Sequence, residues 1–213
     1  YLLSVVVSGA NVLILDEPSN DVDIPTVTIL EDYLNAIDIR LNLFSDAGCE
    51  YADHSLDAGF RFVPVSSGEA SSLFGKLLQT GEISPAETVK LQSYVLLFMG
   101  RCYARRNWNM QLHIGAKRDT NTQLRTRLGP AGGYAAIGSA CDVNSLVCFL
   151  DTLNEEDSLP RTILYTLNPA DNAVFATLTG SYSGSGILGK VQFGPAWWLS
   201  LIHISEPTRP LYI

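Results

Sequence analysis

The sequence lacks the cysteine patterns of a zinc site or a redox motif. Its four cysteines form no Cys-x-x-Cys pair and no Cys/His zinc spacing. We therefore expect free thiols in a reducing compartment rather than disulfides. It also lacks an uninterrupted apolar run of the ~20 residues that a membrane helix needs, and the charged start of a secretion signal. These absences predict a cytoplasmic protein with no membrane partner.

Positive charge is also scarce. The 213 residues include 14 Lys and Arg against 22 Asp and Glu, a formal net charge of -8. The one short basic run, Arg101 to Arg106, is interrupted, whereas phosphate neutralisation needs clustered cations. Nucleic acid is therefore excluded as a partner. With 46% hydrophobic and 17% charged residues, the chain can bury a globular core, and a small molecule is the default ligand.

The first residue is Tyr1, so we expect the true N-terminus to be missing. Residues 11–15 (NVLIL) predict a buried strand that stops at Asp16-Glu17-Pro18. The surrounding residues 1–35 resemble the Walker B and D-loop region of ABC ATPases. That resemblance implies that Asp16 holds Mg²⁺ through water and that Glu17 orients the attacking water. An ATP-binding cassette protein is therefore an alternative function.

The ATPase interpretation needs a phosphate-binding P-loop, and this sequence has no complete one. Its nearest approach is GSGILGK, residues 184–190, where Val191 replaces the required Ser or Thr. At the other end, residues 199–213 contain Pro207 and Pro210, have no period, and resemble the translated read-through of a sequencing adapter. We expect an artefactual or disordered tail there, in which His203 has no function.

Between these ends, apolar runs alternate with longer periodic stretches, a pattern typical of βα units and a parallel sheet. The predicted strands are residues 50–53, 109–114, 162–167 and 190–193. Residues 84–106 predict a helix, because Ser84, Pro85 and Glu87 stand in the order of a cap, a first-turn proline and a first-turn acid. Polar groups follow the strands, where a (β/α)8 barrel has its active site. This arrangement favours an enzyme.

The central residues 36–198 resemble bacterial uronate (glucuronate) isomerases, metal-dependent barrels of the amidohydrolase superfamily. The resemblance lies in four blocks, YADHSLD, MQLHIGAKRDTNTQLRTRLGPAGGYAAIG, DSLPRTILYTLNPADNAVFATLTG and GKVQFGPAWW. It implies interconversion of D-glucuronate with D-fructuronate, and of D-galacturonate with D-tagaturonate. Such a reaction needs a base that takes a proton from C2 and returns it at C1. It also needs an electrophile, such as a divalent Zn or Mn ion, and a cation that binds the substrate carboxylate.

The same resemblance suggests site residues, and each has a structural alternative. It makes His113 a catalytic residue and a possible metal ligand, although a core histidine is the alternative. Asp53 and His54 match a catalytic Asp-His pair, although a loop Asp can simply make a turn. Substrate contacts are implied for two arginines and two tryptophans, which could instead pair with nearby acids or pack in the core: Arg118, Arg125, Trp197 and Trp198.

Two metal-binding motifs of that family are missing from the sequence: an N-terminal His-x-His and a late Thr-Asp-Ser-Arg. We therefore expect an α/β chain with about half of a (β/α)8 barrel, joined to an ATPase-like segment and an artefactual tail. Such a chimera is expected to bind no metal and to be inactive. Exposed barrel edges also predict self-association.

Overall fold

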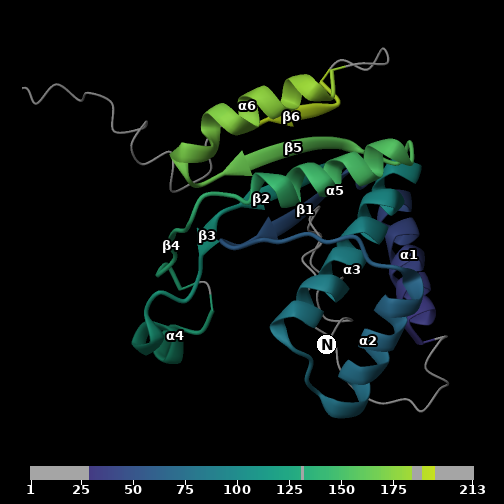
Figure 1. Cartoon of the computed structure of the whole chain (residues 1–213), viewed down its shortest axis with the longest axis horizontal. Helices are drawn as coiled ribbons and strands as arrows, with labels where there is room; N and C mark the ends of the chain where they lie inside the picture. The colour runs from purple at the N-terminus through teal and green to yellow at the C-terminus, as the bar shows by residue number, and fades with distance from the viewer. Residues whose placement is uncertain (1–28, 131, 184–188, 195–213) are drawn as a thin grey trace, which may run out of the picture. The chain divides into compact units, whose positions relative to one another are not determined.

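In the computed structural model, residues 29–130, 132–183 and 189–194 are described, and helices alternate with strands (Figure 1). The elements are α1 (Ile29–Asp46), β1 (Tyr51–Leu56), α2 (Ser67–Thr80), α3 (Pro85–Arg105), β2 (Asn109–Ile114), β3 (Ala116–Lys117), α4 (Thr122–Leu128), β4 (Ala136–Ile137), α5 (Val143–Glu155), β5 (Arg161–Thr166), a 3-10 turn (Pro169–Asp171), α6 (Asn172–Ser181) and β6 (Val191–Phe193). The four strands and the helix predicted for the central segment are confirmed. The predicted strand at residues 11–15 and the tail lie outside the described residues.

The main sheet has the order β1-β2-β5-β6. Near one end of the β1/β2 pair, Asn109 N–H donates to the Glu50 carbonyl at 2.8 Å; near the other, Gly115 N–H donates to the Leu56 carbonyl at 3.0 Å. The donor and the acceptor are the same number of residues apart in both bonds, which is the pattern of parallel strands. β5 and β6 are also parallel. The fold is therefore α/β with a parallel sheet, as predicted.

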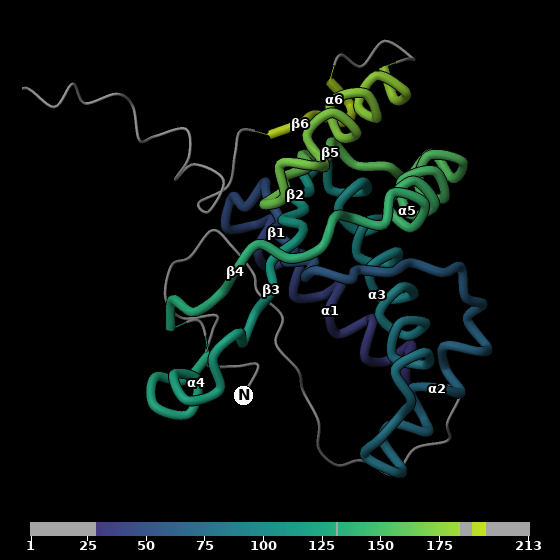
Figure 2. The backbone as a smooth tube through the Cα atoms, turned by 60° about the vertical axis from the view of Figure 1, so that its left-hand side comes forward, coloured from purple at the N-terminus to yellow at the C-terminus, as the bar shows by residue number. Residues whose placement is uncertain are grey.

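Contacts divide the chain into two compact units. The first holds α1, α2, α3 and α5 with the beginnings of β1 and β2, and the second holds the ends of β1 and β2 with β3 through β6. In the second unit, β3 and β4 form a short antiparallel pair, and the chain that connects them carries α4 (Figure 2). No disulfide joins any of the four cysteines. None of the helices in the described ranges is long and apolar enough to cross a membrane.

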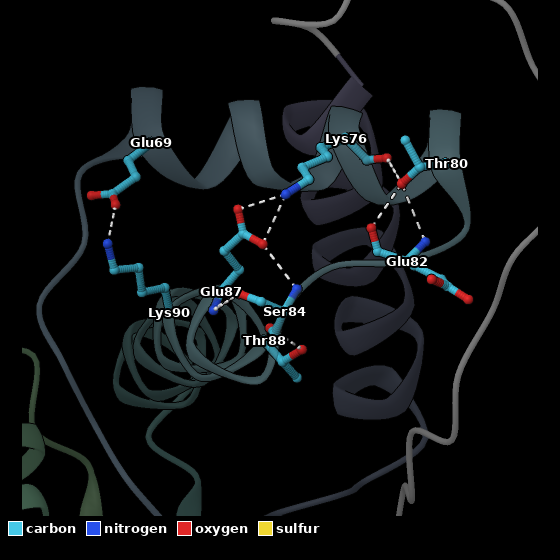
Figure 3. Close-up of polar contacts among 8 residues, drawn as sticks. All are labelled: Glu69, Lys76, Thr80, Glu82, Ser84, Glu87, Thr88 and Lys90. Atoms are coloured by element: carbon cyan, nitrogen blue, oxygen red, sulfur yellow. Dashed lines mark hydrogen bonds and ion pairs between the residues drawn. The ribbon is translucent and has the colours of Figure 1, made fainter.

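Helix α3 begins where the sequence predicted, through a complete capping box. Glu87 N–H donates to the Ser84 hydroxyl at 3.3 Å, and Ser84 N–H donates to the Glu87 carboxylate at 2.8 Å. The same carboxylate accepts two bonds from Lys76 Nζ on α2, at 2.8 and 2.9 Å (Figure 3). A second ion pair, Lys90 with Glu69, also joins α2 to α3. One glutamate thus both caps α3 and ties it to α2.

Asp38 on α1 accepts hydrogen bonds from two arginines that follow one another at the end of α3. Arg106 Nη2 donates to it at 2.9 Å and Arg105 Nη2 at 3.0 Å. The Arg106 side chain is only 10% exposed, so its charge depends on this partner. Burial acts to raise the pKa of Asp38, but hydrogen bonds from Cys102 and Arg106 and the charges of both arginines lower it overall. The cluster is the polar link between α1 and α3.

Replacing Asp38 should destabilise the first unit. Asp38→Asn removes the negative charge and leaves the Arg106 guanidinium buried without a counter-charge, so the free energy of unfolding should fall by about 2 kcal/mol. Urea unfolding followed by circular dichroism measures the change. Asp32→Asn, at an exposed position on the same helix, is the matched control and should cost much less. Equal losses in the two variants would contradict the assigned role of Asp38.

Glu87 should make stability depend on acid pH. Its pKa is lowered from 4.5 to about 2, first by the hydrogen bond from Lys76 and then by those with Ser84. Because the folded state holds this proton more weakly than the unfolded state, the stabilisation is full above about 4.5 and is lost as pH falls towards 2. Glu87→Gln should therefore lower stability at pH 7 and match the wild type near pH 2.

Unfolding midpoints in urea from pH 2 to 7 test this dependence. Glu82→Gln, in the turn just before α3, is the control and should leave the pH profile unchanged. A Glu87→Gln profile parallel to that of the wild type would contradict the prediction.

Candidate active site

Along β2 and β5, every second side chain is buried, and the side chains between them are half-buried except for the exposed Arg161 at the start of β5. On one face the side chains are fully buried: Met110, Leu112, Ile114, Thr162, Leu164 and Thr166. On the other face, His113 and Tyr165 are only half-buried. Because successive side chains of a strand point to opposite faces, one face is core and the other can meet a ligand.

The strand register brings His113 and Tyr165 side by side on the half-buried face. Leu167 N–H donates to the Ile114 carbonyl at 3.0 Å, which sets His113 directly opposite Tyr165. Their rings are stacked, with centroids 4.4 Å apart and planes 11° from parallel. The bond from Gly115 N–H to the Leu56 carbonyl sets Ser55 opposite His113 on the other side. Ser55, His113 and Tyr165 therefore form one row across three strands.

Arg118, one residue after β3, is held beside this row. Its Nε donates to the Asp57 carboxylate at 2.7 Å, and its Nη2 donates to the Ser55 hydroxyl. Its Nη1 has no hydrogen-bond partner in the described part of the chain, and the side chain is 41% exposed. The guanidinium is thus oriented by two residues of the β1 end and retains one nitrogen for a further acceptor. Pairing with a nearby acid was the structural alternative for Arg118, and the bond to Asp57 is such a pair; the sequence did not identify Asp57 or Ser55 as the partners.

The predicted Asp53-His54 pair is split by the strand. In the β1/β2 register, His54 lies opposite Leu112 and therefore on the face of the buried side chains, whereas His113 lies on the other face. Asp53 lies two residues before Ser55 on β1 and therefore shares the face of Ser55. The structure thus associates Ser55, and not His54, with His113. The family resemblance suggested the pair, but adjacent residues of a strand point to opposite faces, and the sequence alone does not show where the strand ends.

Gly138 joins the loops at the carboxyl ends of three strands. Its N–H donates to the Gly115 carbonyl at 2.8 Å, and its carbonyl accepts from Asn168 Nδ2 at 3.0 Å. A Cβ at this position would lie 2.1 Å from the Ala58 Cβ and 2.9 Å from the Gly115 oxygen. Only glycine fits where the ends of β1, β2 and β5 converge.

The carboxylate of Asp171, which is 2% exposed, holds the part of the loop that follows Gly138. It accepts from the Cys141 N–H at 3.1 Å and from the Thr166 hydroxyl at 3.1 Å. A buried carboxylate is stable only when it accepts such bonds. Sequence reasoning missed both Asp171 and Gly138, although the run Asn168-Pro169 after a strand was a signal for a structured turn.

Arg125, another predicted site residue, has a different partner. Arg125 on α4 pairs with Asp119 at 2.8 Å, and no hydrogen bond or ion pair among the described residues joins it to the row. Trp197 and Trp198 lie outside the described residues, as do Asp16 and Glu17. Their roles remain predictions.

The described residues do not form a metal site by themselves. Within residues 29–194, apart from the gaps at 131 and 184–188, no three His, Cys, Asp or Glu side chains gather closely enough to hold an ion. A divalent metal such as Zn or Mn would need further donors from elsewhere, so the residues present do not fit a resident metal. A metal-ligand role for His113 stays a prediction from the resemblance.

Comparison with known sequences decides the family. A sequence model described as Glucuronate isomerase matches residues 17–202. The chain belongs to the glucuronate isomerase family. Among curated relatives, the uronate isomerase of Caldanaerobacter subterraneus is 43% identical over 174 residues, 82% of this chain and 37% of the relative. The enzyme of Caldicellulosiruptor bescii is 42% identical over 170 residues, 80% of this chain and 36% of the relative.

Solved structures of the family agree with the fold. The chain matches a crystal structure of uronate isomerase from Thermotoga maritima with a TM-score of 0.71 at 26% identity, over 80% of this chain and 36% of the other. It matches glucuronate isomerase from Caulobacter crescentus with a TM-score of 0.68 at 27% identity, over 78% and 33%. The chain thus spans just over a third of the length of the curated relatives.

The family match starts within the ATPase-like segment, at Glu17, and ends four residues beyond Trp198. The central segment assigned to uronate isomerases from the sequence is therefore confirmed as such. The ATPase-like and adapter-like segments, and the boundaries at 35 and 198, stay predictions.

Substitution at Gly138 should disrupt the convergence of strand ends. Gly138→Ala forces a methyl group against Ala58 and the Gly115 carbonyl, and overpacking of this kind costs about 1–3 kcal/mol. Gly180→Ala in α6, where a Cβ meets nothing within 4 Å, is the control and should be neutral or slightly stabilising. Thermal unfolding of both variants provides the comparison; a Gly138→Ala protein as stable as the control would contradict the packing.

Proposed function

We propose that this chain is part of a uronate isomerase that interconverts D-glucuronate and D-fructuronate, and D-galacturonate and D-tagaturonate. The family match over residues 17–202 is the observation that carries the proposal. In this reaction a proton leaves C2 of the open-chain sugar acid and returns at C1, while the carbonyl moves the other way. The site must therefore hold a group that can accept and return a proton and a cation for the substrate carboxylate.

His113 is the proposed group for proton transfer or for hydrogen bonding to substrate oxygens. Its imidazole lies on the half-buried face, between Ser55 and Tyr165, and an imidazole can both accept and donate a proton near neutral pH. Asp53 shares that face and is proposed to orient substrate hydroxyls. His54 lies on the other face of β1, so we propose a smaller role for it in catalysis.

Arg118 is the proposed contact for the substrate carboxylate. The bonds to Asp57 and Ser55 fix the guanidinium, and a guanidinium oriented in advance binds a carboxylate with less loss of side-chain freedom. Arg125, Trp197 and Trp198 are further proposed substrate contacts. The distinction between the two arginines rests on proximity to the row, since only Arg118 is joined to it.

We further propose that the parallel sheet is part of a (β/α)8 barrel with the His113 face directed inward. The TM-scores to two uronate isomerases support this, as does the succession of strands in chain order. Cytoplasmic location and self-association through sheet edges belong to the same proposal, because an uncovered parallel edge can pair with another chain.

The direct assay uses purified chain with D-glucuronate and added Zn²⁺ or Mn²⁺, beside a metal-free sample. We expect no fructuronate, because the described residues bring together no three metal donors. Metal-dependent fructuronate formation would show that the chain completes a site by itself and would contradict this expectation.

A segment exchange tests the proposed function itself. The matching segment of the Caldanaerobacter relative is replaced by residues 36–198 of this chain, and the exchanged enzyme should isomerise D-glucuronate. His113→Asn should then lower kcat by about 100-fold or more. His54→Asn, on the opposite face of the sheet, is the matched control and should have the smaller effect. A folded exchanged enzyme without activity, or a His113→Asn variant with full activity, would overturn the proposal.

A further inference from the structure

Tyr165 has two neighbours on the half-buried face, one on each adjacent strand. On β2 the His113 imidazole is stacked on its ring, 4.4 Å between centroids and 11° between planes. On the other side, Gly194 N–H donates to the Leu164 carbonyl at 2.9 Å, in the parallel register of β5 and β6. Gly194, the residue after β6, is therefore opposite Tyr165.

The absence of a side chain at Gly194 makes room for the tyrosine ring. A Cβ on Gly194 would lie 2.4 Å from Tyr165 Cε1 and 2.6 Å from Cδ1. Real Cβ atoms do not approach ring carbons so closely, so any larger residue would displace the ring. The ring thus lies between the backbone of Gly194 and the imidazole of His113.

We propose that Tyr165 is a positioning residue that holds the imidazole of His113 in one orientation on the half-buried face. The χ2 torsion of histidine is broad and roughly two-fold, so an unsupported imidazole samples several orientations. Stacking uses the faces of the imidazole and neither of its nitrogens. Both nitrogens stay at the ring edge, in a plane parallel to the phenol, where hydrogen bonds are made. The positioning of His113 for isomerisation rests on the proposed function, whereas the stack does not.

The stack has a spectroscopic signature in the intact chain. A ring proton above an aromatic face resonates upfield, and the sequence contains only three histidines, so a His113→Asn variant assigns the His113 signals. We expect Tyr165→Phe to keep these signals upfield and Tyr165→Leu to move them downfield. Gly194→Ala should also move them, because it displaces the ring. The His54 signals and the far-ultraviolet circular dichroism serve as controls for the overall fold.

Unchanged His113 signals in Tyr165→Leu, or equal movement in the Phe and Leu variants, would overturn the proposal. If Tyr165→Leu does not fold, Gly194→Ala decides in the same way: moved signals support the stack, and unmoved signals overturn it.

The segment-exchanged enzyme tests positioning separately from the stack. Tyr165→Leu should lower kcat by about 10- to 100-fold, as misplacement of a catalytic group does, with little change in KM, and Tyr165→Phe should restore kcat. Full kcat in a Tyr165→Leu enzyme would overturn the positioning role. An exchanged enzyme that is inactive before any change at Tyr165, together with an upfield His113 signal in the chain, would remove the proposed function and leave the stack standing.

Discussion

The backbone hydrogen bonds between β1, β2, β5 and β6 set the register on which every statement about the site depends. Side chains alternate along each strand, so a slip of one residue would exchange the two faces of a strand. In the observed register the fully buried side chains of β2 and β5 share one face, and His113, Tyr165 and Ser55 share the other. A slipped strand would bury His113 among leucines and expose Leu112. Hydrophobic burial therefore selects the register that also places His113, Tyr165 and Ser55 in one row.

Loops at the carboxyl ends of the strands are fixed by a few contacts that leave little space. Gly138 fits between Ala58 and Gly115 only because it has no side chain, and Gly194 leaves room for Tyr165 in the same way. The buried Asp171 fastens the loop after Gly138 through a backbone N–H. These contacts fix the positions of the loops that border the His113 face of the sheet. In the other unit, the Asp38 and Glu87 clusters join α1, α2 and α3 through charge instead.

Periodicity and capping residues were enough to predict the elements of the central segment. Helix α3 begins at its predicted proline, because Ser84 and Glu87 form a local motif that needs no distant partner. The predicted strands overlap the observed ones, although β1 extends to Leu56, three residues beyond the predicted end. That extension places His54 in the strand as well as Asp53, and successive side chains of a strand lie on opposite faces. His113 was identified through family resemblance. Tyr165 was missed because its meeting with His113 depends on pairing between distant strands, even though both are the penultimate residues of their strands.

The register between β1 and β2 can be measured directly by nuclear Overhauser effects in the isotopically labelled chain. The structure predicts cross-strand contacts between Ser55 and His113 and between His54 and Leu112. It also predicts none between the side chains of His54 and His113. Contacts between those two histidine rings would show a strand shifted by one residue and would contradict the proposed arrangement of the site.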